Sequence, residues 1–285
     1  MTSRPPGPGP ALATAPAPAL AVLGDADAPR HAVVLAPVMP RWDHGSFFHR
    51  VAGPLLTTGH RVTVYDTLSL LCDGDDLKAL ADRWARHLAP HGDGAHGPSS
   101  VTAPDLLVGN ALGGAVVQAL LAHEWTRHAR VLLLSGPTVA DDELDTKLER
   151  IAAAVEAQGL SSALRLLDEA VRGPGPRPGA TTPPRAVPDA GQPGRPDDEL
   201  AGRRLSAGLR LLHEADVRGP VRDFAGDLLH VYGEESLLVQ RRHLVTGAGP
   251  RHQLVGVPRA GMRPHADRPA LTRDTITRFL GAEHS

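Results

Sequence analysis

Short apolar runs alternate with amphipathic stretches along most of the chain. The runs HAVVL, RVTVY, DLLV, RVLLL, DLLHVY and HQLVGV are four to six residues long, a length typical of buried strands. They fall at 31–35, 61–65, 105–108, 130–134, 227–232 and 252–257. Because apolar residues dominate both faces of these runs, we expect a mostly parallel sheet that is covered on both sides.

Helical patterns separate these predicted strands. They span residues 46–58, 76–88, 111–123, 141–171, 197–213 and 268–280. Gly59 ends the first of them in the manner of a glycine after a helix C-terminus. The alternation of strands and helices predicts the α/β class, with a doubly wound and mostly parallel sheet.

The alternation breaks after the fourth predicted strand, which suggests an insertion. Residues 138–222 are mainly helical, and we interpret them as a cap that contains a flexible Pro/Gly-rich loop at 173–196. The core would then consist of residues 19–137 and 223–281. Alternating Pro and Ala at 1–18 predict a disordered tail, because these prolines would interrupt the apolar helix of a secretory signal.

Composition and charge narrow the classes of function. The 285 residues are 41% hydrophobic, enough for one sizeable core, and a net charge of -2 argues against a nucleic-acid surface. No apolar run approaches the roughly 20 residues that span a bilayer.

A single cysteine, Cys72, excludes an internal disulfide and favours a cytoplasmic location. Only two of the 30 basic residues are lysine, a bias that indicates a GC-rich bacterial genome. The 15 histidines lack the spacing of a metal site, and we expect neither metal nor cofactor.

The stretch LLVGNALGG at 106–114 is the most informative motif. A strand enters a glycine-rich turn, and a helix of small residues follows. A phosphate-binding turn is one interpretation, but the lysine and spacing of a P-loop are missing. The stretch resembles the G-x-S-x-G nucleophile elbow of the α/β-hydrolases, with Gly109, Gly113 and Gly114 in the turn and Ala111 at the serine position.

Two later motifs resemble the same family. VYGEESLLV at 231–239 is similar to the late strand and loop that carry the catalytic acid, and Ser236 stands at the acid position. AGMRPHADRP at 260–269 is similar to the family's A-G-H-x-P-H-x-E-x-P motif. There Met262 stands at the position of the catalytic base, while the second histidine is kept as His265.

Further landmarks lie near the N-terminus. RVTVYD at 61–66 resembles a strand that ends in a proline-aspartate turn, in which Asp66 is expected to order the turn. Ala36 and Pro37 occupy the place of a histidine-glycine pair that helps to shape the oxyanion hole. The resemblance covers residues 30–137 and 223–281. It implies an α/β-hydrolase-like fold whose first one or two strands are shortened or absent.

The resemblance also implies a degenerate site. A catalytic triad needs a hydroxyl, an imidazole and a carboxylate, and Ala111, Met262 and Ser236 supply none of these in the required place. Pro37 has no N–H to donate, although the N–H of Leu112 should remain as an oxyanion donor. We therefore expect no acyl-enzyme chemistry through these positions.

Other side chains could replace the lost groups. His265 is an acid/base candidate if its loop overlies the elbow; otherwise it is an ordinary loop histidine. In the loop 41–44, Asp43 and His44 could move protons and Trp42 could form the wall of an apolar pocket, or the loop is purely structural. Asn110 could bind substrate or cap a helix. The candidate substrate-binding residues are Ala36, Pro37, Trp42, Asn110, Ala111, Leu112 and Met262.

Three functions follow as hypotheses. The first is a cofactor-independent cyclase, isomerase or lyase that orients a small organic intermediate of specialised metabolism in the elbow pocket. The second is an inactive ligand-binding or regulatory protein. The third is a hydrolase in which Asp43, His44 or His265 activates water. Each takes a small molecule as its partner, with no nucleic acid and no membrane.

Overall fold

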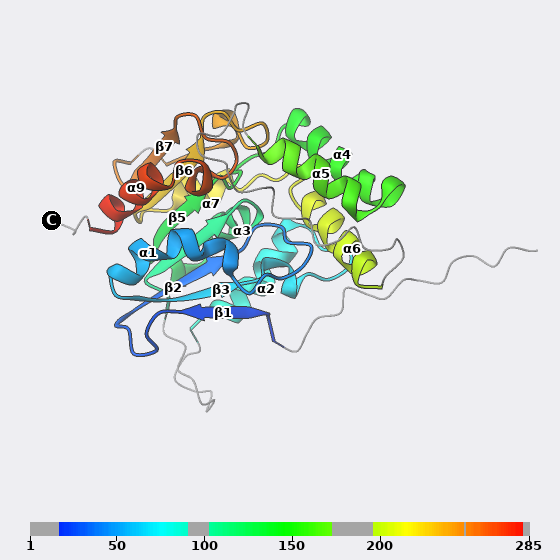
Figure 1. Cartoon of the computed structure of the whole chain (residues 1–285). Coiled ribbons are helices and arrows are strands. Elements are labelled where there is room, and N and C mark those ends of the chain that lie inside the picture. Colours follow the sequence, from blue (N-terminus) through cyan, green and yellow to red (C-terminus); the bar gives the residue numbers. More distant parts are fainter. Residues whose placement is uncertain (1–16, 91–102, 173–195, 248, 282–285) are drawn as a thin grey trace, which may run out of the picture.

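A seven-stranded sheet forms the centre of the computed structural model, which describes residues 17–90, 103–172, 196–247 and 249–281 (Figure 1). The strands are β1 (Leu20–Leu23), β2 (Arg30–Leu35), β3 (His60–Tyr65), β4 (Leu106–Asn110), β5 (Arg130–Leu134), β6 (Leu228–Gly233) and β7 (His252–Val257). Their order in the sheet is β1-β3-β2-β4-β5-β6-β7. β1 pairs antiparallel with β3, and all other pairs are parallel. The predicted fold class and all six predicted strands are confirmed.

The sequence analysis missed β1. This strand has four residues and lies at an edge of the sheet, where Leu20 and Val22 are about half exposed. Such a short strand lacks the length over which an alternating pattern can be recognised. Within the described residues, β1 is the only strand before β2, which agrees with a shortened N-terminal part of the sheet.

Helices cover both faces of the sheet. They are α1 (His49–Thr57), α2 (Leu77–Leu88), α3 (Leu112–Leu120), α4 (Asp142–Gln158), α5 (Leu160–Val171), α6 (Pro196–Arg210), α7 (Arg218–Asp223), α8 (Pro264–Asp267) and α9 (Pro269–Gly281), with short 3-10 turns at Ser46–Phe48, Thr67–Leu70, Glu124–Thr126 and Arg241–His243. The helical stretch predicted at 141–171 is two helices, because Gly159 has φ 86° and ψ 169° and so interrupts the helix. The short helices α7 and α8 were not predicted.

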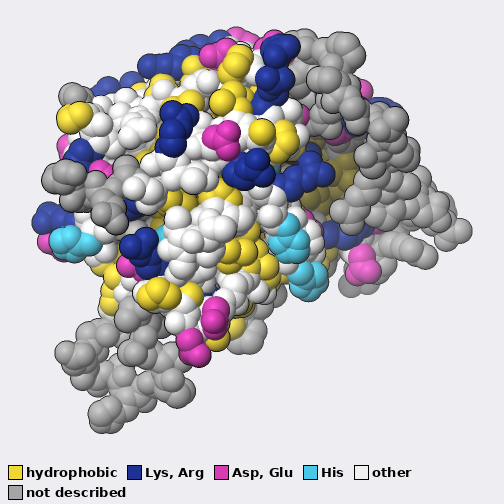
Figure 2. Space-filling model, turned by 60° about the vertical axis from the view of Figure 1, so that its left-hand side comes forward, with side chains coloured by type: hydrophobic (Ala, Val, Ile, Leu, Met, Phe, Trp, Pro, Cys, Tyr) yellow, Lys and Arg dark blue, Asp and Glu magenta, His cyan; other side chains and the backbone are white. Residues whose placement is uncertain are grey.

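Alternate strand side chains build two apolar clusters. Val33, Leu107 and Leu133 point to one face, and belong to a cluster that also contains residues of α2, α3 and the helices α4 to α6. Val34, Val108 and Leu132 point to the other face, where residues of α1 and α9 complete the second cluster. The side of the molecule that carries α1 and α9 comes forward in Figure 2, where charged side chains of both signs are interspersed with apolar ones. In the described part of the chain, no helix combines the length and apolar character needed to cross a membrane.

Helices α4 to α7 lie between β5 and β6 along the chain. Figure 1 shows α4, α5 and α6 together on the side of the sheet toward which the parallel strands run. The segments that lead into and out of this helical unit pair with each other, through a bridge between Val139 and Asp216 and a bond from Ala140 N to Ala215 O of 2.8 Å. The division into a core and a cap at 138–222 stays a prediction. The tail at 1–18 and the loop at 173–196 lie outside the described residues, apart from residues 17, 18 and 196.

The turn from β4 into α3 brings backbone segments very close together. A Cβ atom on Gly113 would lie 2.1 Å from the Leu35 carbonyl oxygen, and one on Gly114 would lie 2.7 Å from the Cα of Gly136. A Cβ on Gly109 would lie 2.5 Å from the Gly113 carbonyl oxygen. These contacts involve backbone atoms, which cannot rotate away as a flexible side chain can. Glycine is therefore required at all three elbow positions.

We predict that Gly113→Ala lowers the free energy of unfolding by more than about 3 kcal/mol, because the backbone of β2 has to move. Gly53→Ala in α1 is the control. Its Cβ would meet no atom within 4 Å, and alanine should stabilise that helix by about 0.5–1 kcal/mol. Urea unfolding of both variants tests this, and equal effects of the two substitutions would show that the elbow has room for a side chain.

Two buried histidines make the stability depend on pH. Burial, with a smaller contribution from the positive charge of Arg241, lowers the pKa of His230 in β6 to about 3. Burial also lowers the pKa of His265 in α8 to about 4, with a smaller contribution from Arg263. At pH values below the ordinary histidine pKa of about 6.5, each of these histidines is protonated in the unfolded chain but stays neutral in the folded protein. Stability should therefore fall as the pH is lowered from about 6.5 toward 4.

We predict that His230→Leu makes the slope of the free energy of unfolding against pH shallower by about 1.4 kcal/mol per pH unit between pH 6 and 4. This is the slope that the uptake of nearly one proton on unfolding produces. The measurement is the free energy of unfolding in urea at pH 6, 5 and 4. His128→Gln, at an exposed position, is the control. If the wild type and His230→Leu lose stability with the same slope, His230 does not carry the effect.

Candidate functional site

Ala111 forms the tip of the turn between β4 and α3. Its backbone has φ 49° and ψ −114°, a conformation that residues other than glycine rarely adopt. Hydrogen bonds hold the tip on both sides: Ala111 N donates to Leu134 O at 3.0 Å, and Ala115 N donates to Ala111 O at 3.1 Å. The sharp strand-to-helix turn predicted from the sequence is therefore present. The side chain that it presents is a methyl group.

Ser236 and Met262 meet beyond the ends of β6 and β7. The Ser236 hydroxyl donates to the Met262 sulfur at 3.7 Å, and the two residues are only 4% and 8% exposed. Because β6 and β7 are neighbours in the sheet, the segments that follow them converge. A thioether is a weak acceptor and a serine hydroxyl carries no charge, so this contact contains no group that titrates near neutral pH.

The segment after β2 also lies against the elbow. Ala36 N donates to Tyr65 O at 3.1 Å, and the Ala36 carbonyl accepts from Thr67 Oγ1 at 2.7 Å. The Ala36 carbonyl oxygen would also lie only 2.6 Å from a Cβ on Gly113. Pro37, the next residue, has no N–H to offer to an oxyanion. Pro37 therefore cannot act as a backbone donor there, and the role of the Leu112 N–H as an oxyanion donor stays a prediction.

The loop at 41–44 places Trp42 in a different apolar cluster from the elbow residues. Trp42 packs against the second apolar cluster, whereas Ala111 and Met262 belong to the first. The Asp43 carboxylate accepts from Phe47 N at 2.9 Å, which orders the turn before α1. His44 is exposed and has φ 55°. Trp42 therefore does not share a cluster with the elbow, and roles for Asp43 and His44 in proton transfer stay predictions.

His265 is buried on α8. The charged groups around its ring are Arg263, Asp267 and Arg50 of α1, so the ring faces the side of the molecule that α1 covers. Its lowered pKa keeps the imidazole neutral at pH 7, and its Nδ1 is buried without a hydrogen-bond partner. Asn110, also buried, lies on the same face of β4 as Val108 of the second cluster. The chemical roles assigned to both residues stay predictions.

The sequence analysis missed an ion pair beside the elbow. Asp66 accepts from Leu68 N at 3.2 Å and thus orders its turn, as predicted. Its carboxylate also accepts from the Arg204 guanidinium at 2.6 Å, which joins α6 to the end of β3. Burial raises the pKa of Asp66, while Arg204 opposes this shift. No sequence pattern indicates which partner an arginine on a helix will find.

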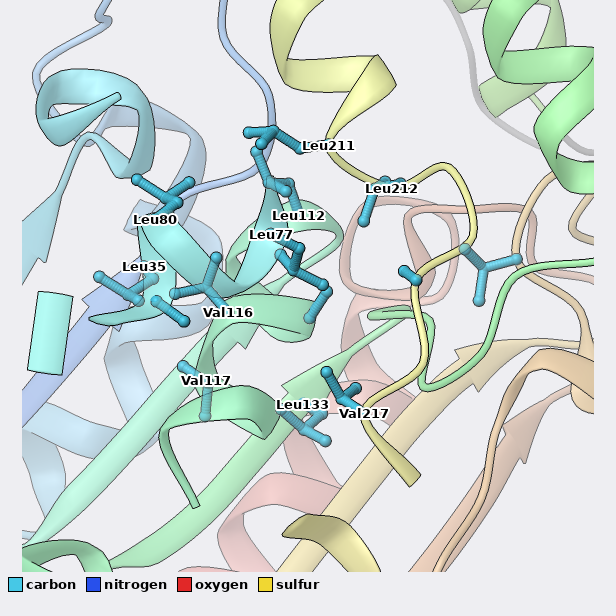
Figure 3. Close-up of a cluster of buried hydrophobic side chains, with 14 of the residues drawn as sticks. Leu35, Leu77, Leu80, Leu112, Val116, Val117, Leu133, Leu211, Leu212 and Val217 are labelled. Carbon is cyan, nitrogen blue, oxygen red and sulfur yellow. The ribbon is translucent and has the colours of Figure 1, made fainter. Parts of the chain in front are cut away.

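Helix α6 packs on two loops at the carboxyl ends of the strands. A Cβ on Gly208 would lie 2.9 Å from Val38 Cγ1 and 3.0 Å from Leu68 Cδ1, so the helix rests directly on the loops after β2 and β3. Buried leucines from this region belong to the same apolar cluster as Leu112 and Met262. Figure 3 shows part of this cluster, with Leu211 and Leu212 just after α6 and Leu112 at the elbow. Leu112 is fully buried in this cluster, whereas Ala111 at the tip of the turn is partly exposed.

A polar hollow on the surface lies apart from the elbow. A surface hollow of about 640 Å³ lies beside Ser236 and is lined by Glu234, Glu235, Ser236, Leu237, Gln240, Arg241 and Arg242. Ala111 and Leu112 are not among the residues that line it. Across the described residues, no three His, Cys, Asp or Glu side chains gather in a way that could hold a metal ion.

Comparison with known proteins reveals similarity in structure only. No protein-family model and no curated protein sequence matches the chain. Among solved structures, the chain is similar to MGS-M2, an α/β hydrolase from a Medee basin deep-sea metagenome library, with a TM-score of 0.67, 11% identity and coverage of 94% of this chain and 95% of that one. The esterase EaEST from Exiguobacterium antarcticum gives a TM-score of 0.66 at 13% identity, covering 92% and 95%. A bromoperoxidase from Bacillus anthracis gives 0.64 at 16% identity, also covering 92% and 95%.

These comparisons contradict the predicted cyclase, isomerase or lyase. The similar structures are named as a hydrolase, an esterase and a bromoperoxidase, and nothing in them supports a cyclisation or isomerisation. That function is therefore withdrawn.

The fold itself is clear from the geometry and the comparisons together. A mostly parallel sheet with helices on both faces carries a strained strand-to-helix turn at Ala111, and helices lie between β5 and β6. The similar structures match this arrangement over more than nine tenths of the chain. The protein has the α/β-hydrolase fold.

Proposed function

We propose that this protein is a degenerate member of the α/β-hydrolase fold that binds a small organic molecule without converting it. In this proposal Ala111, Ser236 and Met262 occupy the positions of the nucleophile, the acid and the base. The observation that carries it is the 3.7 Å contact between the Ser236 hydroxyl and the Met262 sulfur, near a strained elbow that ends in a methyl group.

The chemistry of acyl transfer cannot begin with these groups. A serine nucleophile attacks only when an imidazole takes its proton, and a carboxylate orients that imidazole. Ala111 has no proton to lose and no oxygen to attack with. The Met262 thioether does not act as a base near neutral pH, and the Ser236 hydroxyl supplies no negative charge. The N–H of Leu112 could still bind a carbonyl oxygen, which favours recognition over turnover.

Hydrolysis through a relocated base has little support from the contacts. One oxygen of the Asp43 carboxylate, Oδ2, orders the turn before α1, while Oδ1 is buried without a hydrogen-bond partner. His265 is neutral at pH 7 and could accept a proton, but its charged neighbours place it toward α1. Among the hydrogen bonds and ion pairs of the described residues, none joins the side chain of Asp43 or His265 to residues 109–114.

We predict that the wild-type protein hydrolyses p-nitrophenyl butyrate no faster than a protein without an active site does at the same concentration. The variant Ala111→Ser should remain within about tenfold of it, because Met262 cannot deprotonate the new hydroxyl. Initial rates over a range of ester concentrations test both. Saturable turnover by the wild type, or fast cleavage by Ala111→Ser alone, would contradict the proposed assignment.

We predict that restoring all three groups has a different result. The variant Ala111→Ser/Ser236→Asp/Met262→His should exceed Ala111→Ser in kcat/KM by at least about tenfold, since the three groups act as a unit. Ala111→Ser/Ser236→Asp is the matched control, because it lacks only the imidazole. If the triple variant folds with an unchanged circular dichroism spectrum and gains nothing, these positions do not correspond to a triad.

A further inference from the structure

The polar hollow beside Ser236 is bounded by two segments that follow β6. Residues 234–237 and residues 240–242 line it, and its volume is about 640 Å³. Sites for small molecules usually enclose about 300–1,000 Å³. The residues at the turn between β4 and α3 do not line this hollow, so its chemistry is separate from that of the elbow.

Hydrogen bonds hold the backbone of both segments in place. The amides of Glu234 and Glu235 donate to carbonyl oxygens at the end of β7 and just after it, at 3.1 and 2.9 Å. In the second segment, Gln240 N donates to His243 Nδ1 at 3.0 Å, and His243 N donates to Gln240 O at 2.9 Å. Because the walls are already ordered, a ligand would lose little free energy to ordering them.

The two arginines of the hollow differ in how their charge is compensated. The guanidinium of Arg242 lies 2.6 Å from Asp141 and 2.5 Å from Glu143, so its charge already has partners. Arg241 Nη1 donates to the carbonyl oxygen of Leu244 at 3.0 Å. Within the described part of the chain, Nε and Nη2 of Arg241 form no hydrogen bond and no carboxylate pairs with them. Arg241 therefore offers two N–H groups and an uncompensated positive charge.

The two glutamates of the hollow carry the opposite charge. Glu234 is exposed and Glu235 is half-buried. Across residues 17–90, 103–172, 196–247 and 249–281, neither carboxylate forms an ion pair, not even with Arg241 in the same hollow. Two adjacent carboxylates repel each other and attract a cation. The hollow thus presents charges of both signs that do not neutralise one another.

We propose that this hollow binds a small zwitterion. Its ammonium group lies at the carboxylates of Glu234 and Glu235, and its carboxylate accepts from Nε and Nη2 of Arg241, a two-bond contact typical of arginine. The side chain of Leu237, which is 40% exposed, adds an apolar contact. An amino acid or a short peptide with an apolar side chain has this chemistry. The inference goes beyond the proposed function, because none of these charged groups stands at a triad position.

Titration of ¹⁵N-labelled protein with the dipeptide Gly-Leu, followed by NMR, tests the site. We expect saturable shifts of the amides at 234–242, with a Kd on the order of 1 mM. N-acetyl-Gly-Leu lacks the ammonium and Gly-leucinamide lacks the carboxylate, so each should bind at least about tenfold more weakly. Leucine, titrated in parallel, distinguishes a free amino acid from a peptide. If neither leucine nor Gly-Leu binds, or if both blocked peptides bind as well as Gly-Leu, the proposal is overturned.

A variant without the guanidinium tests which group reads the carboxylate. Arg241→Met should bind Gly-Leu at least about tenfold more weakly than the wild type and should no longer distinguish it from Gly-leucinamide. Arg278→Met on α9 is the matched control. Arg278 also donates to a main-chain carbonyl and pairs with no carboxylate among the described residues, but it does not line the hollow.

The control should keep its affinity within about twofold, and circular dichroism shows whether each variant is folded. A folded Arg241→Met protein that still prefers Gly-Leu to Gly-leucinamide would contradict the assignment of Arg241. Ester hydrolysis by the wild type would refute the proposed function instead, and the peptide titrations would be independent of it.

Discussion

Where β4 turns into α3, the backbone leaves no space for side chains. Gly109, Gly113 and Gly114 lie against backbone atoms of Leu35 and Gly136 and against one another, at distances that a Cβ could not tolerate. This close approach sets how far α3 lies from the sheet and where β2, β4 and β5 end relative to one another. It also forces Ala111 into its strained conformation. The requirement is one of packing, so it holds whether or not the tip of the turn carries a reactive oxygen.

The backbone at the site forms a sharp, strained turn, but the side chain at the tip of this turn is an unreactive methyl group. The turn between β4 and α3 presents the methyl group of Ala111, and the segments after β6 and β7 bring together the Ser236 hydroxyl and the Met262 thioether. The charged side chains of Asp66 and Arg204 have a structural role. Asp66 orders its turn and pairs with Arg204, which ties the inserted helices to the core.

Much of the fold could be predicted from the sequence, because six strands were long enough to show continuous apolar runs and the glycines marked the elbow. The missed elements β1, α7 and α8 have four to six residues, too few for a period to emerge. The site was harder to predict. The motifs correctly indicated that the segments carrying Ser236 and Met262 meet, but not that Trp42 packs in the other cluster or that Arg204 pairs with Asp66. Those contacts depend on how α1 and α6 pack in three dimensions, and local patterns do not encode this.

The absence of an activated nucleophile is the central claim, and a fluorophosphonate probe tests it most directly. Such a probe forms a covalent bond with any serine whose hydroxyl is activated for acyl transfer. The account predicts that the intact mass of the native protein is unchanged after incubation with the probe, with an active serine esterase labelled in parallel. A stoichiometric mass increase of one phosphonyl group, mapped to a serine such as Ser236 or the buried Ser135, would contradict it.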